Sequence, residues 1–419
     1  MEPNREKSAG DEAVGDSKES MSERFKFDRM ELAGSLGDLG TLLPIAIAMV
    51  LFNGLSPLGL FLSIGVFYVI SGIYFGVTVP VQPMKVIGAY AIATAMSADQ
   101  ILASSLLMGV FLLIVGITGA IDVIRKFTPK SVIRGVQLST GTLLISSGIK
   151  FMIGTSKFQA LQNAAEPYLA FQSIGPIPIS LVIGGIAGIV TLLLLDSRKF
   201  PAGLIVVAGG LLAGLALGAR VDLGPGRIGL NLPEILPFGF PGKADFTFAL
   251  FALALPQLPM TLGNAVLAYT DLSTEYFKDR SSKVTNRNAC VSMALANFLS
   301  FGLGGMPLCH GAGGLAAHYR FGARTAGSNL MIGLIFVALA ILFGNNIVNV
   351  LNLLPMSILG VLLTFAGSQL ALTIMDLKDR KDYFVTTLIL GITLASNLAA
   401  GFIAGMVIAH VLRWEKLSV

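Results

Sequence analysis

Two short polar motifs, each interrupted by proline, break an otherwise hydrophobic chain, and both carry groups that can bind an anion. The first spans residues 80–85 (PVQPMK) and the second spans residues 306–314 (MPLCHGAGG). Proline lacks a backbone N–H and clashes with the preceding helical turn, so neither motif can continue an uninterrupted helix. Each motif predicts a short extended stretch followed by a helix with unpaired N–H groups and about half a positive charge at its start. Such a helix start favours a small anion.

The first motif adds a fixed positive charge. We expect its helix to span residues 83–95, with Lys85 in the first turn. A cation there faces the positive end of the helix dipole, and at the centre of a bilayer it costs roughly 3 kcal/mol or more. A bound dianion would relieve both penalties, whereas the alternatives are pairing with Asp38 or snorkelling toward the cytoplasm. The predicted substrate contacts of this motif are Gln82, Pro83, Met84 and Lys85.

The second motif offers bare backbone and one titratable ring. Glycines at 311, 313 and 314 would let an oxyanion approach the N–H groups closely, although glycines also serve close helix packing. His310 can donate a hydrogen bond or take up a proton; the alternative is a structural cap bonded to a nearby carbonyl. The sequence around Cys309 and His310 contains no further metal ligands, so no metal site is predicted. The predicted contacts of this motif are Cys309, His310, Gly311, Ala312 and Gly313.

Polar residues elsewhere in the apolar blocks complete the candidate site. Buried acids often relay protons in membrane proteins, so Asp38 and His310 are the candidates for proton coupling. The alternative role of Asp38 is to balance Lys85. Neutral hydrogen-bonding side chains suit the orientation of substrate oxygens, although bonds between helices are the common alternative. These further predicted contacts are Asp38, Thr41, Gln257, Thr261 and Asn264.

Composition places these motifs in a membrane protein. The chain is 54% hydrophobic and 13% charged, with a mean hydropathy of +0.78, whereas soluble domains carry about 25% charged residues. We predict an all-α integral membrane protein with about fourteen transmembrane segments. The predicted segments are 36–55, 58–76, 80–96, 101–121, 135–154, 176–195, 200–219, 246–270, 287–303, 306–319, 326–343, 347–367, 383–396 and 398–412, the last two joined as a hairpin at Asn397.

The N-terminal residues 1–28 have a different composition, rich in charged and small residues. They lack the apolar core and cleavage site of a signal peptide, so we interpret them as a disordered cytoplasmic tail, with a regulatory segment as the alternative. The two cysteines, Cys290 and Cys309, form neither a disulfide framework nor a zinc pattern, and no cofactor is predicted. No basic stripe is interleaved with aromatics, which argues against nucleic-acid binding.

The distribution of Lys and Arg predicts the orientation. With the N-terminus inside, the outer segments hold few cations, and an even number of crossings puts both termini in the cytoplasm. These outer cations are Lys150, Lys157, Arg220, Arg227 and Lys243. Seven crossings per half is an odd number, so the second half must enter the membrane inverted, as in secondary transporters. We expect repeats at residues 29–222 and 246–419, joined by an extracellular loop at 223–245.

Four segments resemble the molybdate transporter family. They are residues 31–41 (ELAGSLGDLGT), 80–85 (PVQPMK), 257–264 (QLPMTLGN) and 306–324 (MPLCHGAGGLAAHYRFGAR). The resemblance implies kinship with sulfate permeases and the uracil-transporter architecture. It further implies a core (30–124 and 246–344) that moves against a gate (125–222 and 345–414), with substrate between the third and tenth segments, which are half-helices. The related carriers often have a coupling carboxylate where this chain has Gln257, which puts coupling through that helix in doubt.

Together these observations predict a transporter and not an enzyme, because the sequence contains no nucleophile set, paired carboxylates or metal cluster. Given the resemblance, which alone favours molybdate and implies the elevator-type alternating-access movement, we expect a secondary active transporter in the plasma (inner) membrane that imports molybdate. Sulfate or tungstate is the alternative substrate, because these dianions share its charge and tetrahedral shape. A passive anion channel is a further alternative. The expected partners are the oxyanion, the bilayer and a proton or other coupling ion, and a homodimer is left open.

Overall fold

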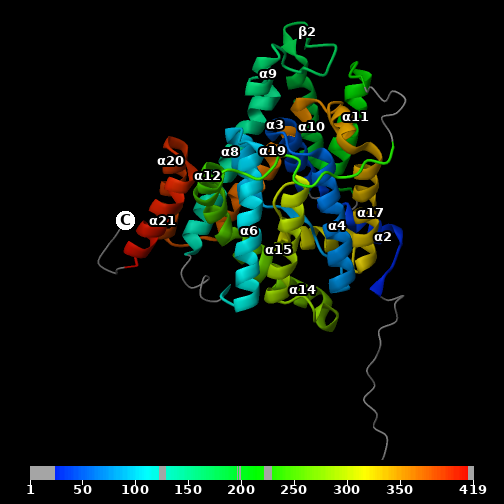
Figure 1. Ribbon diagram of the computed structural model, residues 1–419. Coiled ribbons are helices and arrows are strands. Elements are labelled where there is room, and N and C mark those ends of the chain that lie inside the picture. Colours follow the sequence, from blue (N-terminus) through cyan, green and yellow to red (C-terminus); the bar gives the residue numbers. More distant parts are fainter. Residues whose placement is uncertain (1–23, 122–128, 196, 198–199, 221–228, 414–419) are drawn as a thin grey trace, which may run out of the picture.

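The computed structural model describes residues 24–121, 129–195, 197, 200–220 and 229–413, which form a mostly helical molecule (Figure 1). Most of the predicted tail lies outside these residues. The part that is described is held in place, because the backbone N–H of Lys26 donates to Oγ1 of Thr325 at 3.2 Å. Asp28 caps the first described helix through the N–H groups of Met30 and Glu31. The described residues of the predicted tail, 24–28, are thus attached to the helical part of the molecule.

Each of the predicted apolar blocks contains a helix. The described helices of the first half, of which α2 and α9 lie outside the predicted blocks, are α2 (Arg29–Ser35), α3 (Leu39–Asn53), α4 (Pro57–Phe75), α5 (Lys85–Thr94), α6 (Ala98–Thr118), α8 (Lys130–Ile153), α9 (Lys157–Leu161), α10 (Ile179–Leu194) and α11 (Ala202–Ala216). In the second half they are α12 (Lys243–Ala249), α13 (Leu255–Met260), α14 (Tyr269–Phe277), α15 (Asn286–Leu303), α16 (Ala312–Phe321), α17 (Ala326–Phe343), α18 (Ile347–Leu351), α19 (Met356–Ala371), α20 (Arg380–Ala395) and α21 (Leu398–Val411).

Length and composition identify the helices that are able to cross a membrane. Within the described residues, six helices are long and apolar enough, or seven if α2 and α3, which are bent by 47°, form one span. The apolar helices α5, α10, α11 and α21 are shorter. The molecule is thus a mostly helical membrane-type protein, and the count of fourteen crossings stays a prediction.

The boundaries of two predicted segments differ from the structure, and one turn is as expected. The helix after the first motif begins at Lys85, not at Pro83, because Pro83 belongs to the extended strand β1 (Gln82–Pro83). Helix α12 begins at Lys243, inside the predicted loop 223–245, of which residues 223–228 lie outside the described part. The predicted hairpin at Asn397 is confirmed, since its side chain caps α21 by accepting from the N–H of Ala400 at 2.9 Å.

The helices pack in pairs that join the two halves. Helix α4 packs on α17, α6 packs on α15, and α8 packs on α19. If the second half repeats the first, α4 corresponds to α15, α6 to α17 and α8 to α19. Exchanging the halves then converts the α4–α17 pair into the α15–α6 pair and leaves the α8–α19 pair unchanged. This pattern agrees with an internal repeat. Helices α8 and α19 approach closely at two glycines. A Cβ on Gly141 would lie 2.6 Å from the carbonyl oxygen of Gly367, and a Cβ on Gly367 would lie 2.6 Å from the carbonyl oxygen of Gly141. Helices α20 and α21 lie at the opposite flank from α17 (Figure 1).

The eighth predicted block is one continuous but irregular helix. Helices α12, α13 and α14 are joined by two π-helical stretches, Leu250–Ala254 and Thr261–Ala268. Pro256 and Pro259 lie in α13, between these stretches. Proline removes one backbone donor and obstructs the normal ladder, and π-helical turns are frequent at functional sites. The irregular part of the helix carries Gln257, which faces the start of α5.

Candidate functional site: an anion-binding cavity

The structure brings the two proline motifs together. Strand β1 of the first motif pairs antiparallel with β4 (Leu308–Cys309) of the second, with Gln82 opposite Cys309 and Pro83 opposite Leu308. The N–H of Met84 also donates to the carbonyl of Pro307 at 2.9 Å. The paired strands satisfy one another's backbone N–H and C=O groups, because leaving such groups unpaired away from water is costly. Helices α5 and α16 therefore begin from one shared strand pair.

Two buried asparagines hold the extended segments in place. Asn329 of α17 accepts from the N–H of Val79 at 2.8 Å and donates to its carbonyl at 2.8 Å. Asn297 of α15 does the same for Leu308, at 3.2 Å and 2.8 Å. Each side chain thus pairs with both backbone groups of one extended residue, as a neighbouring strand would. Sequence analysis missed both residues, although an asparagine within an apolar block is a detectable signal.

The start of α5 is already occupied by a side chain. Oε1 of Gln257 accepts from the backbone N–H groups of Val86 at 2.9 Å and Ile87 at 3.2 Å. Nε2 of Gln257 donates to Oγ1 of Thr261 at 2.8 Å, which fixes the orientation of the amide. Two of the donors that the sequence offered to an anion are thus satisfied within the protein. The predicted contacts Gln257 and Thr261 form a helix cap and lie outside the cavity lining.

The start of α16 is open. Among the residues that the structure describes, none accepts a hydrogen bond from the backbone N–H groups of Ala312, Gly313 or Gly314. Gly313 is exposed, and a Cβ added to it would meet nothing within 4 Å. These are the orphan donors of a helix N-terminus, where the dipole also favours negative charge.

A carboxylate–amide pair lies beside this open helix start. Nε2 of Gln82 donates to both carboxylate oxygens of Asp38, at 2.7 and 2.8 Å. A Cβ on Gly314 would lie 2.5 Å from Oδ2 of Asp38 and 2.7 Å from Nε2 of Gln82, so only glycine allows this approach. Within the described part of the chain, Oε1 of Gln82 is buried without a hydrogen-bond partner. An unsatisfied buried acceptor is costly, and it identifies a place where a donor or a proton would be stabilising.

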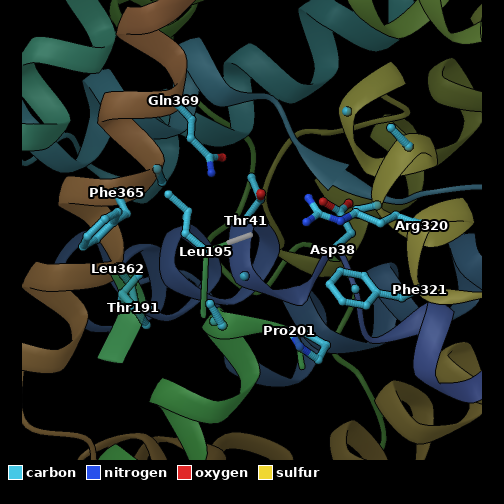
Figure 2. A pocket seen from close by; sticks show the side chains of 18 of the residues that line it. Asp38, Thr41, Thr191, Leu195, Pro201, Arg320, Phe321, Leu362, Phe365 and Gln369 are labelled. Atoms are coloured by element: carbon cyan, nitrogen blue, oxygen red, sulfur yellow. The ribbon is translucent and has the colours of Figure 1, made fainter. Parts of the chain in front are cut away.

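These groups border a cavity of about 330 Å³ that continues into a second lobe of about 210 Å³. The residues that line both lobes are Thr41, Lys85, Gly313, Ala366 and Gln369. Figure 2 shows Asp38 and Arg320 on one side, Leu362 and Phe365 on the other, and Thr41 and Gln369 between them. At about 30 Å³ per water molecule, the larger lobe has room for a hydrated ion.

The charges around the cavity favour an anion. Lys85 is half-buried, and within the described residues its ammonium has neither a hydrogen bond nor an ion pair. The exposed Arg320, from the last turn of α16, contributes a second cation to the lining. The start of α16 adds about half a positive charge. Asp38 is the single carboxylate among the lining residues, so the sum is positive.

The cavity contains part of the predicted site and omits the rest. The predicted residues that line it are Asp38, Thr41, Gln82, Lys85, Gly313 and Asn264. Those outside the lining are Pro83, Met84, Gln257, Thr261, Cys309, His310, Gly311 and Ala312. Sequence analysis missed Arg320 and two glutamines of the predicted gate, Gln137 and Gln369. Polar residues within apolar blocks were the available signal for the two glutamines.

His310 has a structural environment. Its Nδ1 lies 2.9 Å from the carbonyl oxygen of Pro80, and its Nε2 lies 3.1 Å from Oγ of Ser292. The ring is fully buried and stacks on Tyr269 with centroids 5.0 Å apart. Both nitrogens are therefore engaged away from the cavity, which favours the alternative of a histidine bonded to a nearby carbonyl.

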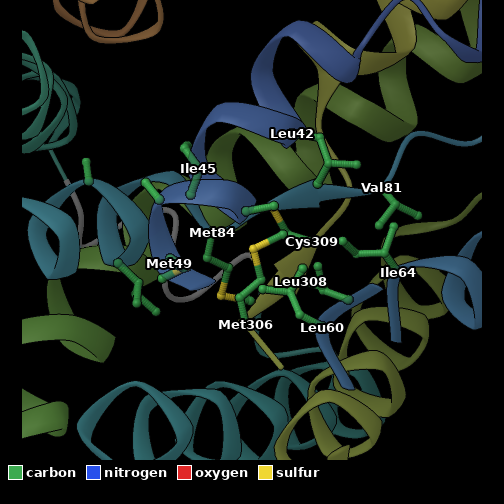
Figure 3. Packing of buried hydrophobic residues seen from close by; sticks show 14 of the residues in the cluster. Leu42, Ile45, Met49, Leu60, Ile64, Val81, Met84, Met306, Leu308 and Cys309 are labelled. Atoms are coloured by element: carbon green, nitrogen blue, oxygen red, sulfur yellow. The ribbon is translucent and has the colours of Figure 1, made fainter. Parts of the chain in front are cut away.

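Cys309 is likewise part of the packed interior. Figure 3 shows it among Met84, Met306 and Leu308, below Leu42. All of these side chains are buried, and Sγ of Cys309 lies 3.6 Å from the carbonyl oxygen of Pro83. The cluster packs against the strand pair, and the thiol lies in this packed interior and not in the cavity lining.

The chain matches the family model described as "Molybdate transporter of MFS superfamily" over residues 30–144 and 249–370. Solved structures with the same fold include the transmembrane domain of the cyanobacterial bicarbonate transporter BicA, with a TM-score of 0.64 and 15% identity over 91% of this chain and 96% of that one. Murine Slc26a9, an anion transporter solved in the inward-facing state, gives a TM-score of 0.64 and 15% identity over 92% and 68% of the two chains.

Curated relatives agree with the family model. Molybdate transporter 2 of Arabidopsis thaliana is 31% identical and covers 93% of this chain and 88% of its own. Molybdate transporter 1 of Chlamydomonas reinhardtii is 31% identical over 92% of both chains. These relatives are transporters, as is the family, which confirms the prediction of a transporter in place of an enzyme. The chain belongs to the molybdate transporter family.

Proposed function

We propose that this protein is a secondary active transporter that imports molybdate, and that the oxyanion binds at the open start of α16. The observation that carries the proposal is that N–H groups around Gly313, which have no acceptor among the described residues, meet the cations Lys85 and Arg320 in one cavity. Backbone donors at a helix start bind tetrahedral oxyanions without a dedicated side chain. Lys85 supplies a point charge that suits such ions.

The neutral polar residues of the cavity orient the ion. Thr41 and Gln369 line both lobes, and Asn264 and Gln137 line the smaller one. A tetrahedral dianion has four oxygens that can each accept hydrogen bonds, and these hydroxyl and amide groups approach it from several directions. Sulfate and tungstate have the same charge and shape, so they are the alternative substrates for this site.

Asp38 is the candidate for proton coupling. Its carboxylate is 3% exposed and lies against the start of α16, where it is held by Gln82. An ionised Asp38 competes with a dianion for the same positive helix end, because like charges at close range repel each other strongly away from water. A proton on Asp38 would remove that repulsion, so proton and oxyanion would load together. The other candidate, His310, has both nitrogens engaged elsewhere.

The cavity lies between the predicted core (30–124 and 246–344) and the predicted gate (125–222 and 345–414). Core helix α3 and gate helix α11 touch here, since a Cβ on Gly203 would lie 2.3 Å from Cα of Gly40. At the end of the smaller lobe the path is closed by packed side chains, with Ile45 and Leu144 each 1% exposed. A closed path supports a carrier with alternating access over a passive channel. The distribution of cations supports an orientation with both termini inside, and we place the protein in the plasma (inner) membrane.

Uptake of radiolabelled molybdate into proteoliposomes tests this function. We expect saturable uptake that is stimulated by an inwardly directed proton gradient, competed by tungstate and sulfate and unaffected by uracil. Asp38→Asn should remove the stimulation by the gradient while retaining uptake. Large single-channel currents would contradict a carrier, and stronger uptake of sulfate than of molybdate would reassign the substrate.

A further inference from the structure

A separate cavity of about 300 Å³ lies between the ends of α3, α5, α8 and the short helix α9. Its lining includes the ammonium-bearing side chains Lys150 and Lys157, together with the hydroxyl-bearing residues Ser147 and Ser156. Both lysines are exposed. In the described part of the chain neither ammonium has a hydrogen bond or an ion pair, so both charges are available to a ligand.

An aromatic group also lines this cavity. Phe52 of α3 stacks on Phe151 of α8 with ring centroids 4.5 Å apart, and Phe158 of α9 packs edge-on against Phe52 at 5.6 Å. Stacked and edge-on aromatic pairs stabilise a contact by about 0.5–1.5 kcal/mol beyond burial of their area. The contact joins the predicted core to the predicted gate at this end of the molecule, which is the end that carries α9 in Figure 1.

The same helices line both cavities, at different positions along their length. On α3, Thr41 and Ile45 line the anion-binding cavity, whereas Phe52 lines this one. Helix α8 presents Leu144 to the first and Ser147 to the second. At a rise of about 1.5 Å per residue, Thr41 and Phe52 are about 16 Å apart along the helix. Both cavities thus belong to one seam between α3, α5 and α8.

A packed layer separates the two cavities within that seam. A Cβ on Gly88 of α5 would lie 2.7 Å from Cγ2 of Ile45 and 4.0 Å from Cε of Met49. Ile45, Met49 and Leu144 are each 1% exposed. The layer is therefore closed to an ion in this state, while the second cavity remains open to its own side.

The predicted distribution of Lys and Arg places this cavity on the outer side of the protein. The predicted outer side of the protein carries few cations, and two of them, Lys150 and Lys157, meet in this one cavity. Two unpaired cations at the mouth of a cleft raise the local concentration of an anion and its association rate.

We propose that this second cavity is the outer entrance of the transport path, where Lys150 and Lys157 bind the tetrahedral dianion before the packed layer opens. The inference rests on the proposed oxyanion transport and adds a recruitment site to it. In this proposal Lys150 and Lys157 bind substrate that arrives from one side, whereas Lys85 holds the ion in the anion-binding cavity.

The test compares the two directions of transport by the full-length protein in oriented vesicles. In the double variant Lys150→Gln, Lys157→Gln we expect the KM for molybdate uptake to rise about tenfold at low ionic strength, with the maximal rate unchanged. The KM for efflux from the opposite side should not change. The uptake KM of the wild type should rise with salt, and the variant should lose most of that dependence. Lys243→Gln, at the exposed start of α12 and outside the cavity lining, is the matched control.

Each outcome separates the inference from the function on which it rests. An unchanged uptake KM in the double variant, in a protein that still transports molybdate, would overturn the entrance alone. No oxyanion transport by the wild type would overturn both. Labelling gives an independent measurement, because Cys290 and Cys309 are buried and Ser147→Cys adds one accessible thiol. A negatively charged, membrane-impermeant thiol reagent should react faster there than a positively charged one, and equal rates would contradict the proposal.

Discussion

The starts of α5 and α16 occupy corresponding places in the two halves but present different surfaces. In α5 the first donors are capped by Gln257, and a lysine provides the charge. In α16 the donors are free of protein acceptors within the described residues, and glycine leaves the backbone bare. If the two halves are an internal repeat, as the sequence predicts, the repeat supplies two similar helix ends and the side chains around them differ.

The residues opposite these helix ends explain the difference. Gln257, from the eighth predicted segment, reaches the start of α5, and Asp38, from the first, reaches the start of α16. The two residues hold equivalent positions if the halves are exchanged. The glutamine fills its helix end directly, whereas the aspartate is held by Gln82 and leaves the α16 donors open. Under the proposed function, filling one end and leaving the other open would confine the anion to a single site.

The largest effect is expected from Gly314→Ala, which breaks the contact between α16 and the Asp38–Gln82 pair. The new Cβ would lie 2.5 Å from Oδ2 of Asp38 and 2.7 Å from Cβ of Pro80. Because these atoms belong to a buried cluster, the pair must move and the open helix end is lost. We expect uptake of molybdate to fall to background in proteoliposomes.

Gly391→Ala is the control for this variant, since a Cβ at that position of α20 meets nothing within 4 Å. Its uptake should equal that of the wild type. Size-exclusion profiles establish whether the Gly314 variant is still folded. If a folded Gly314→Ala protein took up molybdate at the wild-type rate, the close approach of Asp38 to α16 would have no role in transport.

Lys85→Ala removes the charge that the first half contributes. Hydrogen bonds to charged groups contribute about 1.5–3 kcal/mol, so the affinity for molybdate should fall roughly ten- to hundredfold. Within the described residues the ammonium makes no hydrogen bond or ion pair and has only a longer-range attraction to the Asp38 carboxylate, so the unfolding temperature should change little. Lys85→Arg keeps the charge and should retain part of the affinity. Normal uptake kinetics in Lys85→Ala would remove this residue from the site.

The sequence predicted the meeting of the motifs because pattern and composition determine it. Prolines at 80 and 83 and at 307 exclude continuous helices, and the order of the apolar blocks places both interruptions at equivalent points. Asp38 and Lys85 were expected near each other for the same reason, and both line the cavity. These features depend on local rules that each half obeys separately.

Contacts between distant segments were not predictable in this way. Nothing in the spacing of Gln257 indicates that its amide reaches Val86, because that contact depends on how α13 crosses α5. His310 looked available for substrate, yet tertiary packing buries it against Tyr269. Residues such as Gln369 enter the cavity only when the two predicted domains come together.

Gln257→Ala tests whether the α5 cap is structural. It leaves the N–H groups of Val86 and Ile87 unpaired in a buried place, which should destabilise the fold by about 1–3 kcal/mol. We expect a lower unfolding temperature in detergent and a smaller loss of molybdate affinity than in Lys85→Ala. Gln257→Glu retains an acceptor for both N–H groups and should restore most of the stability. Equal unfolding temperatures for wild type and Gln257→Ala would mean that the cap contributes nothing measurable.

The smallest effect, and the sharpest test of the comparison, is expected from Gly313→Ala. A Cβ here meets no protein atom within 4 Å, and alanine favours helix over glycine by about 1 kcal/mol, so the fold should be unharmed. The methyl group would project into the cavity beside the open N–H groups. It should weaken molybdate binding by roughly 1 kcal/mol, about fivefold, with the maximal rate retained.

The same measurement on Gly391→Ala controls for the added methyl group, because that position is equally open and lines neither lobe of the cavity. A raised KM in Gly313→Ala alone would place the ion at the start of α16. An unchanged KM in both variants would mean that the oxyanion does not approach this helix end. The open and the capped helix would then differ in structure without differing in function, and Lys85 would have to hold the ion with the gate residues instead.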